Sequence, residues 1–289
     1  NSDASFLPNP VSLLDITDKT TQERLLANAF FEVRPIDGLL LKANFGIDRN
    51  YQKLKQYMPT TTLYGQRENG AASIAQGDNS DYLMELTANY TKQVGDHNFN
   101  ALVGHSYQLF TYEMFSGKSN DFITDGFLYN NLGAGNAKRP TVESSATESR
   151  MASFFGRLNY TFKDRYLLTA TLRADGSSNF ASGERWGFFP SVAAGWRFTE
   201  EEFLAPLRSV LSNGKLRLSY GETGNSNVGD KAYSYYKVGN NNIFGSSMIN
   251  GVYLDQFGNS VLTWETAREW NVGLDLGFLD GRINVTAEY

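Results

Sequence analysis

The chain has 289 residues, with 26 Lys and Arg against 31 Asp and Glu, and it contains no Cys. The absence of Cys excludes disulfides, thiolate metal sites and cysteine nucleophiles, and the slightly acidic balance gives no sign of a nucleic-acid partner. No segment approaches the roughly 18 consecutive apolar residues of a transmembrane helix. A mean hydropathy of -0.40 still allows a transmembrane β-barrel, because only alternate residues of its strands contact lipid.

The first part of the chain predicts two hairpins. After a loop over residues 1–21, apolar and polar side chains alternate along Gln22–Arg34 and Leu39–Asn50, with a tight turn between these segments. A long polar segment is predicted over residues 51–80. The next strands are Asp81–Gln93 and a strand that starts at Phe99, with a short turn that includes His97 between them.

The middle of the chain carries the clearest alternation. A second long polar segment, residues 112–147, leads to strands at Glu148–Phe162, Tyr166–Asp175 and Arg185–Phe198. Even-numbered positions from residue 166 are apolar, while the odd-numbered ones are mostly polar. Side chains alternate across a strand, so each strand has one apolar face along its whole length. These strands reach the roughly 9 to 11 residues that a tilted strand needs to cross a bilayer.

The last part of the chain continues the pattern. Residues 200–211 are predicted as a short helix, and Lys215–Gly221 as a strand. The longest loop is predicted over residues 222–265. A strand at Trp270–Phe278 and another from Ile283 follow it. Short and long connections therefore alternate, which is typical of outer-membrane barrels and is not expected of a soluble sandwich.

Several of these strands resemble the SusC/RagA class of TonB-dependent outer-membrane transporters. The likeness lies in YLLTATLRADGSS at residues 166–178, RWGFFPSVAAGWR at 185–197, KLRLSYGETGNSN at 215–227 and the triplet Trp264–Thr266. The resemblance implies an all-β fold: an antiparallel transmembrane β-barrel segment of about ten strands from a larger, plugged barrel of about 22 strands. We expect residues 1–289 to form part of one barrel domain, as an internal piece without the plug and N-terminal domains.

The same resemblance implies a function and partners. The parent protein would import oligosaccharides or peptides across the bacterial outer membrane, driven through the TonB complex, with a SusD-like surface lipoprotein over its long loops. Neither substrate class is favoured by the residues. We expect no enzyme activity and no cofactor. The alternative is a complete, small ten-stranded outer-membrane barrel acting as an adhesin, a pore or a surface protease. His97 and His105 are poorly placed for a protease site, and two lone His without Cys do not predict a metal site.

Two groups of residues are candidates for contact with a substrate. Aromatic side chains in the long loops lie among Asn and Asp, a combination that suits a sugar ring or a peptide side chain, although packing between loops would explain them equally well. Two roles are open for the charged side chains that are predicted to face the lumen. They form ion pairs with one another or with a plug, or they contact substrate. The loop aromatics are Phe127, Tyr129, Tyr233, Tyr235, Tyr236, Tyr253 and Trp264, and the lumen-facing charges are Arg173, Asp175, Arg217 and Asp275.

Overall fold

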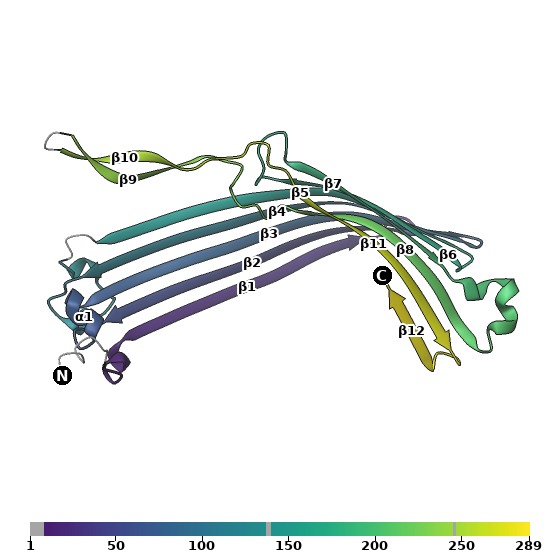
Figure 1. Ribbon diagram of the computed structural model, residues 1–289, viewed down its shortest axis with the longest axis horizontal. Coiled ribbons are helices and arrows are strands. Elements are labelled where there is room, and N and C mark those ends of the chain that lie inside the picture. The colour runs from purple at the N-terminus through teal and green to yellow at the C-terminus, as the bar shows by residue number, and fades with distance from the viewer. Residues whose placement is uncertain (1–8, 137–139, 245–246) are drawn as a thin grey trace. The chain divides into compact units, whose positions relative to one another are not determined.

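Long antiparallel strands dominate the computed structural model, which describes residues 9–136, 140–244 and 247–289 (Figure 1). The described residues contain one short α-helix, α1 Leu63–Glu68, between the second and the third strand. The strands are β1 Thr17–Val33, β2 Leu39–Met58, β3 Ala71–Val94, β4 His97–Asn120, β5 Thr141–Phe162, β6 Tyr166–Ser177, β7 Trp186–Trp196, β8 Leu211–Asn225, β9 Tyr235–Phe244, β10 Ser247–Gln256, β11 Glu265–Phe278 and β12 Ile283–Glu288. The 3-10 helices are η2 Ser12–Asp15, η3 Asp125–Phe127, η4 Leu132–Ala134, η5 Phe198–Glu200 and η6 Glu202–Leu207.

Ten of the described strands form one sheet in chain order, β1 to β8 followed by β11 and β12. Strands β9 and β10 form a separate hairpin that is inserted between β8 and β11. Strand β6 pairs antiparallel with β5 and with β7 without a register shift, so that Ala174 lies opposite Phe154 on one side and Phe188 on the other. The predicted all-β, antiparallel fold with about ten sheet strands is confirmed.

The chain divides into two compact units. Unit 1 comprises Asn1–Asn28, Gly46–Tyr82 and Leu109–Glu148, and unit 2 comprises Ala29–Phe45, Leu83–Gln108 and Ser149–Tyr289. The core of unit 1 consists of Tyr57, Ala72 and Phe122, against which side chains of the β4–β5 connection pack. In unit 2, Phe180 and Phe189 are buried.

Several strands are longer than the sequence predicted. Strand β2 continues to Met58 rather than ending at Asn50, and β3 begins at Ala71 rather than Asp81. Likewise, β4 extends to Asn120 and β5 begins at Thr141, so about half of the two predicted polar segments is strand. The prediction was wrong because it required alternating hydrophobicity. A strand with polar residues on both faces can form the same backbone ladder but gives no such signal.

Three smaller predictions also differ from the structure. The loop predicted over residues 222–265 contains the β9–β10 hairpin. In place of the helix predicted over residues 200–211, the structure has the shorter 3-10 helix η6, which contains Pro206, and η5 ends at the first residue of that range. His97 is the first residue of β4 rather than part of a turn.

The tight turns follow from backbone conformations that few residues adopt. Lys163 and Asp164, between β5 and β6, have φ angles of 51° and 52°, as the two central residues of a type I′ hairpin turn do. Gly38, before β2, has a φ of 82°, which favours glycine. None of the helices in the described residues has the length and apolarity to cross a membrane.

Candidate functional site

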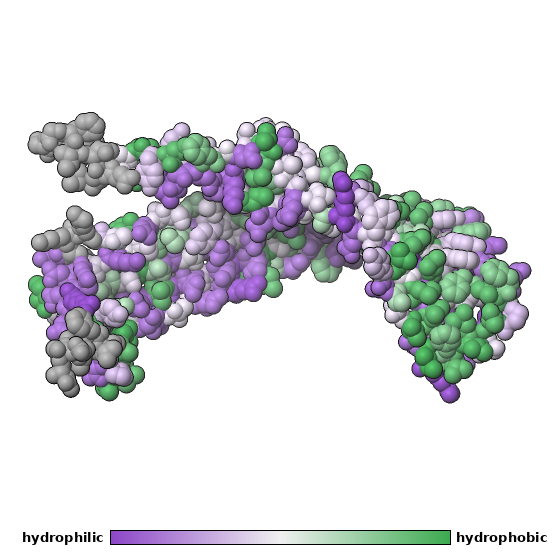
Figure 2. All heavy atoms as spheres, in the orientation of Figure 1, coloured by the Kyte–Doolittle hydropathy of each residue, from purple (hydrophilic) through white to green (hydrophobic). Residues whose placement is uncertain are grey.

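One face of the sheet in unit 2 is an exposed apolar surface. Along β6, Tyr166, Leu168, Ala170 and Leu172 are exposed, whereas the residues between them are partly covered. Strand β7 repeats this alternation from Trp186 to Trp196, and the register keeps the exposed residues of both strands on the same face. We call this face the outer face and the opposite one the inner face. Figure 2 shows hydrophobic side chains gathered over the end of the sheet formed by β8, β11 and β12.

Aromatic side chains on the outer face form two rows. In the lower row, near the β5–β6 turn, the ring of His97 stacks 4.7 Å from that of Phe162, and its Nδ1 lies 2.8 Å from the hydroxyl of Tyr160. In the upper row, the ring of Phe154 stacks 4.5 Å from that of His105. The lower row consists of His97, Phe99, Tyr160, Phe162, Tyr166 and Trp196, and the upper row of His105, Phe154 and Trp186. Tyr220 and Trp270 form a separate aromatic pair on β8 and β11, and Tyr220 lies opposite Val192 of β7.

The distance between the rows matches the thickness of a bilayer. Trp186 and Trp196 lie at the two ends of β7, ten residues apart. At a rise of about 3.3 Å per residue the strand segment is about 33 Å long, and a tilt of about 40° reduces its height to about 25 Å. Transmembrane barrels carry an apolar band of about this height between two aromatic girdles. The band between the rows therefore has the dimensions of a membrane-spanning wall.

The inner face carries a continuous chain of hydrogen-bonded side chains. Asn100 on β4 donates from Nδ2 to Asn89 Oδ1 at 2.9 Å and to Thr91 Oγ1 at 2.8 Å, both on β3. Asn159 on β5 donates to Asn100 Oδ1, and Thr169 on β6 donates to Asn159 Oδ1. These bonds link four neighbouring strands through side chains as well as through the backbone. The inner face is thus a polar surface in which these groups are mutually satisfied.

The four predicted lumen-facing charges form two ion pairs on the inner face. Arg173 donates from Nε to Asp175 Oδ2 at 2.8 Å on the same strand, and from Nη2 to Ser153 Oγ on β5. Arg217 on β8 binds Asp275 on β11 through two parallel hydrogen bonds of 2.8 and 3.0 Å. Such a bidentate pair fixes the orientation of both groups.

Two of the predicted loop aromatics hold the base of the loops in unit 2. Trp264 donates from its indole nitrogen to the carbonyl of Arg185 at 2.9 Å, and its ring lies 5.3 Å from the rings of both Phe180 and Phe189. Tyr233 donates from its hydroxyl to the carbonyl of Phe180 at 3.1 Å. We call Phe180, Phe189, Tyr233 and Trp264 the loop anchor.

The loop anchor depends on a close approach between Phe189 and a neighbouring strand. A Cβ added to Gly224 on β8 would lie 2.0 Å from the ring of Phe189, so only glycine fits there. Phe189 is buried on the inner face of β7, while Phe188 beside it is exposed on the outer face. The connection between β8 and β11 is therefore packed against the inner face at its base.

Three other predicted aromatics lie on the β9–β10 hairpin. Tyr235 and Tyr236 are on β9 and Tyr253 is on β10, and all three are exposed. Tyr236 is the most exposed, at 69%. Lys237 forms an ion pair with Asp255 across the hairpin, at 2.8 Å. The hairpin therefore presents tyrosine rings to the surroundings.

Phe127 and Tyr129 lie in unit 1, on the β4–β5 connection. Phe127 ends η3 and is exposed, whereas Tyr129 packs against the unit 1 core. The ammonium of Lys55 lies 5.3 Å from the centroid of the Tyr129 ring. Tyr129 is thus engaged in packing, and Phe127 is the more accessible of the two.

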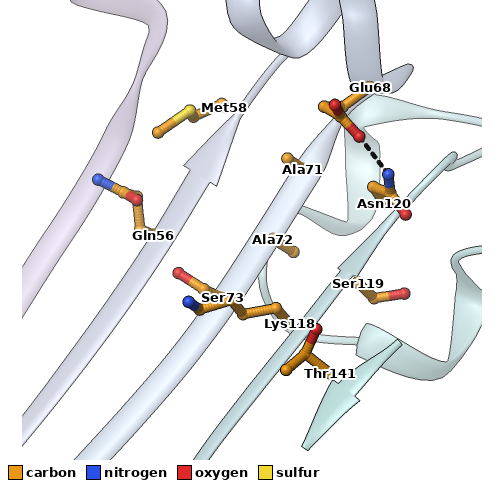
Figure 3. A pocket seen from close by; sticks show the side chains of 10 residues that line it. All are labelled: Gln56, Met58, Glu68, Ala71, Ala72, Ser73, Lys118, Ser119, Asn120 and Thr141. Atoms are coloured by element: carbon orange, nitrogen blue, oxygen red, sulfur yellow. Dashed lines mark hydrogen bonds between the residues drawn. The ribbon is translucent and has the colours of Figure 1, made fainter. Parts of the chain in front are cut away.

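A pocket of about 380 Å³ lies within unit 1 (Figure 3). Small side chains of β3 form one wall, and Lys118 and Ser119 of β4 lie beside them. The amide of Asn120 donates to the carboxylate of Glu68 at one end of the pocket. Its lining thus combines charged groups, hydroxyls and amides with a similar amount of apolar surface. The lining residues are Gln56, Met58, Glu68, Ala71, Ala72, Ser73, Lys118, Ser119, Asn120 and Thr141.

The family of this chain is shown by its sequence. A family model described as "TonB dependent receptor-like, beta-barrel" matches residues 3–289. The chain belongs to this family of TonB-dependent receptors. The family consists of outer-membrane receptors and transporters, in agreement with the two-faced wall described above.

Individual relatives support this assignment. The receptor is 33% identical to TonB-dependent receptor P3 of Formosa agariphila over 100% of this chain, and 41% identical to TonB-dependent receptor SusC of Bacteroides thetaiotaomicron over 72% of it. The solved structure of the RagAB peptide transporter superposes with a TM-score of 0.83 at 26% identity, over 94% of this chain. The chain covers only 29%, 21% and 30% of the lengths of these three proteins.

Sequence reasoning missed the groups that hold the receptor's unit 1 together. Asp125 accepts hydrogen bonds from the hydroxyls of Tyr57 and Thr60, both at 2.7 Å, and so joins the end of β2 to the β4–β5 connection. No motif marks these residues, because the partners are more than sixty positions apart in the chain. Among the described residues, no group of three or more His, Cys, Asp or Glu is arranged to hold a metal ion.

The environment of Asp125 makes the stability of unit 1 dependent on pH. Desolvation alone would raise the pKa of Asp125, but hydrogen bonds from Thr60 and Tyr57 outweigh it and lower the pKa. The folded pKa is therefore below the unfolded value of about 3.9. The stabilisation is present above that value and is lost as the pH falls through the folded pKa.

We expect amide hydrogen exchange of residues 121–136 in the intact receptor to accelerate as the pH is lowered below about 4, beyond the intrinsic effect of pH on exchange. Asp125→Asn removes the titrating group. In this variant, amide exchange of residues 121–136 is therefore expected to show only the intrinsic effect of pH. An identical pH profile in the two proteins would show that Asp125 does not govern it.

Proposed function

We propose that this chain forms part of the barrel wall of a transporter that imports oligosaccharides or peptides across the bacterial outer membrane. The observation that carries the proposal is the two-faced wall of unit 2. Its outer face has an apolar band of about 25 Å between aromatic rows, and its inner face is polar and hydrogen-bonded. In this arrangement the outer face contacts lipid and the inner face lines the lumen.

The proposed energy source and partners rest on the relatives. In the whole protein, a segment outside this chain would contact the TonB complex, and a SusD-like surface lipoprotein would cover the long loops. The similarity to SusC and to the RagAB peptide transporter supports this arrangement. The long connections that such a lipoprotein would cover include residues 121–136 in unit 1, and residues 226–244 and 247–264 in unit 2.

We assign substrate contact first to the exposed loop aromatics. Tyr236, Tyr253 and Phe127 present ring surface that is not occupied by the core of unit 1 or by the loop anchor. An aromatic ring with a polar hydroxyl suits stacking on a sugar or on a peptide side chain. Trp264 and Tyr233 serve instead to position the loop, because both are engaged with Phe180.

The polar groups of the unit 1 pocket and of the inner face are second candidates. Hydroxyls, amides and the ammonium of Lys118 can hydrogen-bond to peptide groups or sugar hydroxyls. The likeness to the RagAB peptide transporter makes peptides the first class to test, and oligosaccharides the second.

The proposal is tested with the complete receptor and its partner lipoprotein in cells with and without TonB. We expect uptake of a defined peptide mixture or a defined oligosaccharide mixture, and loss of that uptake without TonB. Tyr236→Ala should weaken binding of the imported class by up to about tenfold, because stacking contributes about 0.5 to 1.5 kcal/mol.

Tyr64→Ala is the matched control, since Tyr64 is another exposed tyrosine but lies on α1. It should leave affinity unchanged. Uptake that is equal in cells without TonB would contradict energised import. Equal affinity in the wild-type protein and the Tyr236→Ala variant would show that Tyr236 does not contribute to substrate binding. That result would not contradict the proposed import.

A further inference from the structure

The connection between β7 and β8, residues 197–210, is hydrogen-bonded to residues at the edge of the outer face of unit 2. Glu201 accepts hydrogen bonds from the indole nitrogen of Trp196 at 3.0 Å, from Arg165 at 3.2 Å and from the hydroxyl of Tyr166. Trp196 and Tyr166 belong to the lower aromatic row. The acidic group therefore ties this connection to the edge of the apolar band.

A second set of contacts places η5 against β8. The ring of Phe198 packs edge-on against Trp196, with centroids 5.9 Å apart, and a Cβ on Gly214 would lie 2.4 Å from it. Thr199 accepts from the backbone nitrogen of Gly214 at 3.0 Å, and Arg208 donates to the carbonyl of Thr199 at 2.7 Å. Glu201 holds the beginning of η6 against the lower row, and Arg208 holds its end against Thr199.

The 3-10 helix η6 is amphipathic. Side chains three residues apart eclipse one another in a 3-10 helix. Phe203 and Pro206 therefore form one apolar ridge, Leu204 and Leu207 form a second, and Glu202 and Ala205 lie on the third. Phe203 is 71% exposed and Leu207 is 53% exposed.

We propose that the apolar ridges of η6 insert into the phospholipid interface of the periplasmic leaflet. Short connections of outer-membrane barrels face the periplasm, and the lower aromatic row marks the interfacial depth. The exposed ridges continue the apolar band past this row, so the occupant that fits them is the boundary between headgroups and acyl chains. The inference rests on the membrane placement under the proposed function, and it adds an anchor that is not a membrane-spanning strand.

Spin labels on introduced cysteines test the proposal in the complete receptor, reconstituted in phosphatidylethanolamine and phosphatidylglycerol vesicles. Labels at Phe203 and Leu207 should collide more with oxygen than with a water-soluble nickel chelate. Labels at Glu202 and Ala205, on the third ridge of the same helix, should show the opposite preference. A label at Leu168, within the apolar band, reports the membrane placement itself.

Two other results would contradict the insertion of η6 into the lipid interface. If labels at Phe203 and Leu207 match those at Glu202 and Ala205, the connection lies in water. If they are shielded from both reagents, another segment of the receptor or another protein covers the ridges. Either result with a lipid-exposed label at Leu168 rejects the anchor alone, whereas a water-exposed label at Leu168 rejects the membrane placement together with it.

Discussion

Leu172→Arg is expected to reduce the free energy of unfolding of the receptor by about 2 to 4 kcal/mol, the loss typical of a charge on the lipid face near the bilayer midplane. Leu172 is 56% exposed on the outer face, and it pairs with Pro190, which lies between the two tryptophans of β7. Arg at this position must reach the membrane surface or bring water into the hydrocarbon. Unfolding of the complete receptor from phospholipid vesicles by denaturant measures the effect.

Ser191→Arg is the matched control at almost the same depth. Ser191 is next to Pro190 on β7 but belongs to the inner face, where it pairs with Thr171 and Gly221. An Arg there can extend into a polar lumen, so we expect a much smaller change. A larger loss for Ser191→Arg than for Leu172→Arg would mean that the two faces are reversed.

Phe189→Ala is expected to destabilise the loop anchor by about 3 to 5 kcal/mol, as removal of a buried phenylalanine ring typically does. Phe189 is 7% exposed and fills the space between Trp264 and Gly224. The cavity left by the ring would free the base of the β8–β11 connection. We expect faster amide exchange and faster proteolysis over residues 226–239 and 251–264, with the ten-stranded sheet retained.

Phe188→Ala provides the comparison on the opposite face of the same strand. Phe188 is 64% exposed on the outer face, away from the loop anchor, so its truncation should leave the protection of the connection unchanged. Equal protection of the connection in the wild-type protein and the Phe189→Ala variant would show that the loop anchor does not hold it.

The sequence predicts the strands well where they carry the apolar band, and it does not predict the parts of strands that lie beyond this band. Strand β6 was predicted to begin at Tyr166, where it does begin, because its outer residues are apolar and its inner residues are mostly polar. The end of β2 was not predicted. Beyond Asn50, Lys53 and Lys55 share one face with Tyr51 and Tyr57, so hydrophobicity no longer distinguishes the two faces.

The candidate site was less predictable, because an aromatic residue in a loop is compatible with both packing and binding. Trp264 and Tyr236 looked alike in the sequence, but the structure engages Trp264 with Phe180 and Phe189 and leaves Tyr236 exposed. The difference arises from contacts with residues more than seventy positions away from Trp264 in the chain. Hairpin β9–β10 was missed as well, since its two strands pair only with each other and show no long apolar alternation.

The insertion between β8 and β11 has a consequence for how such receptors diversify. Asn225 and Glu265 face each other as the first pair of the β8–β11 ladder, so the chain leaves the wall and returns to it at neighbouring positions. The entropic cost of closing a loop rises only slowly with its length. The inserted segment can therefore change in length and sequence during evolution while the register of the β8–β11 ladder stays the same.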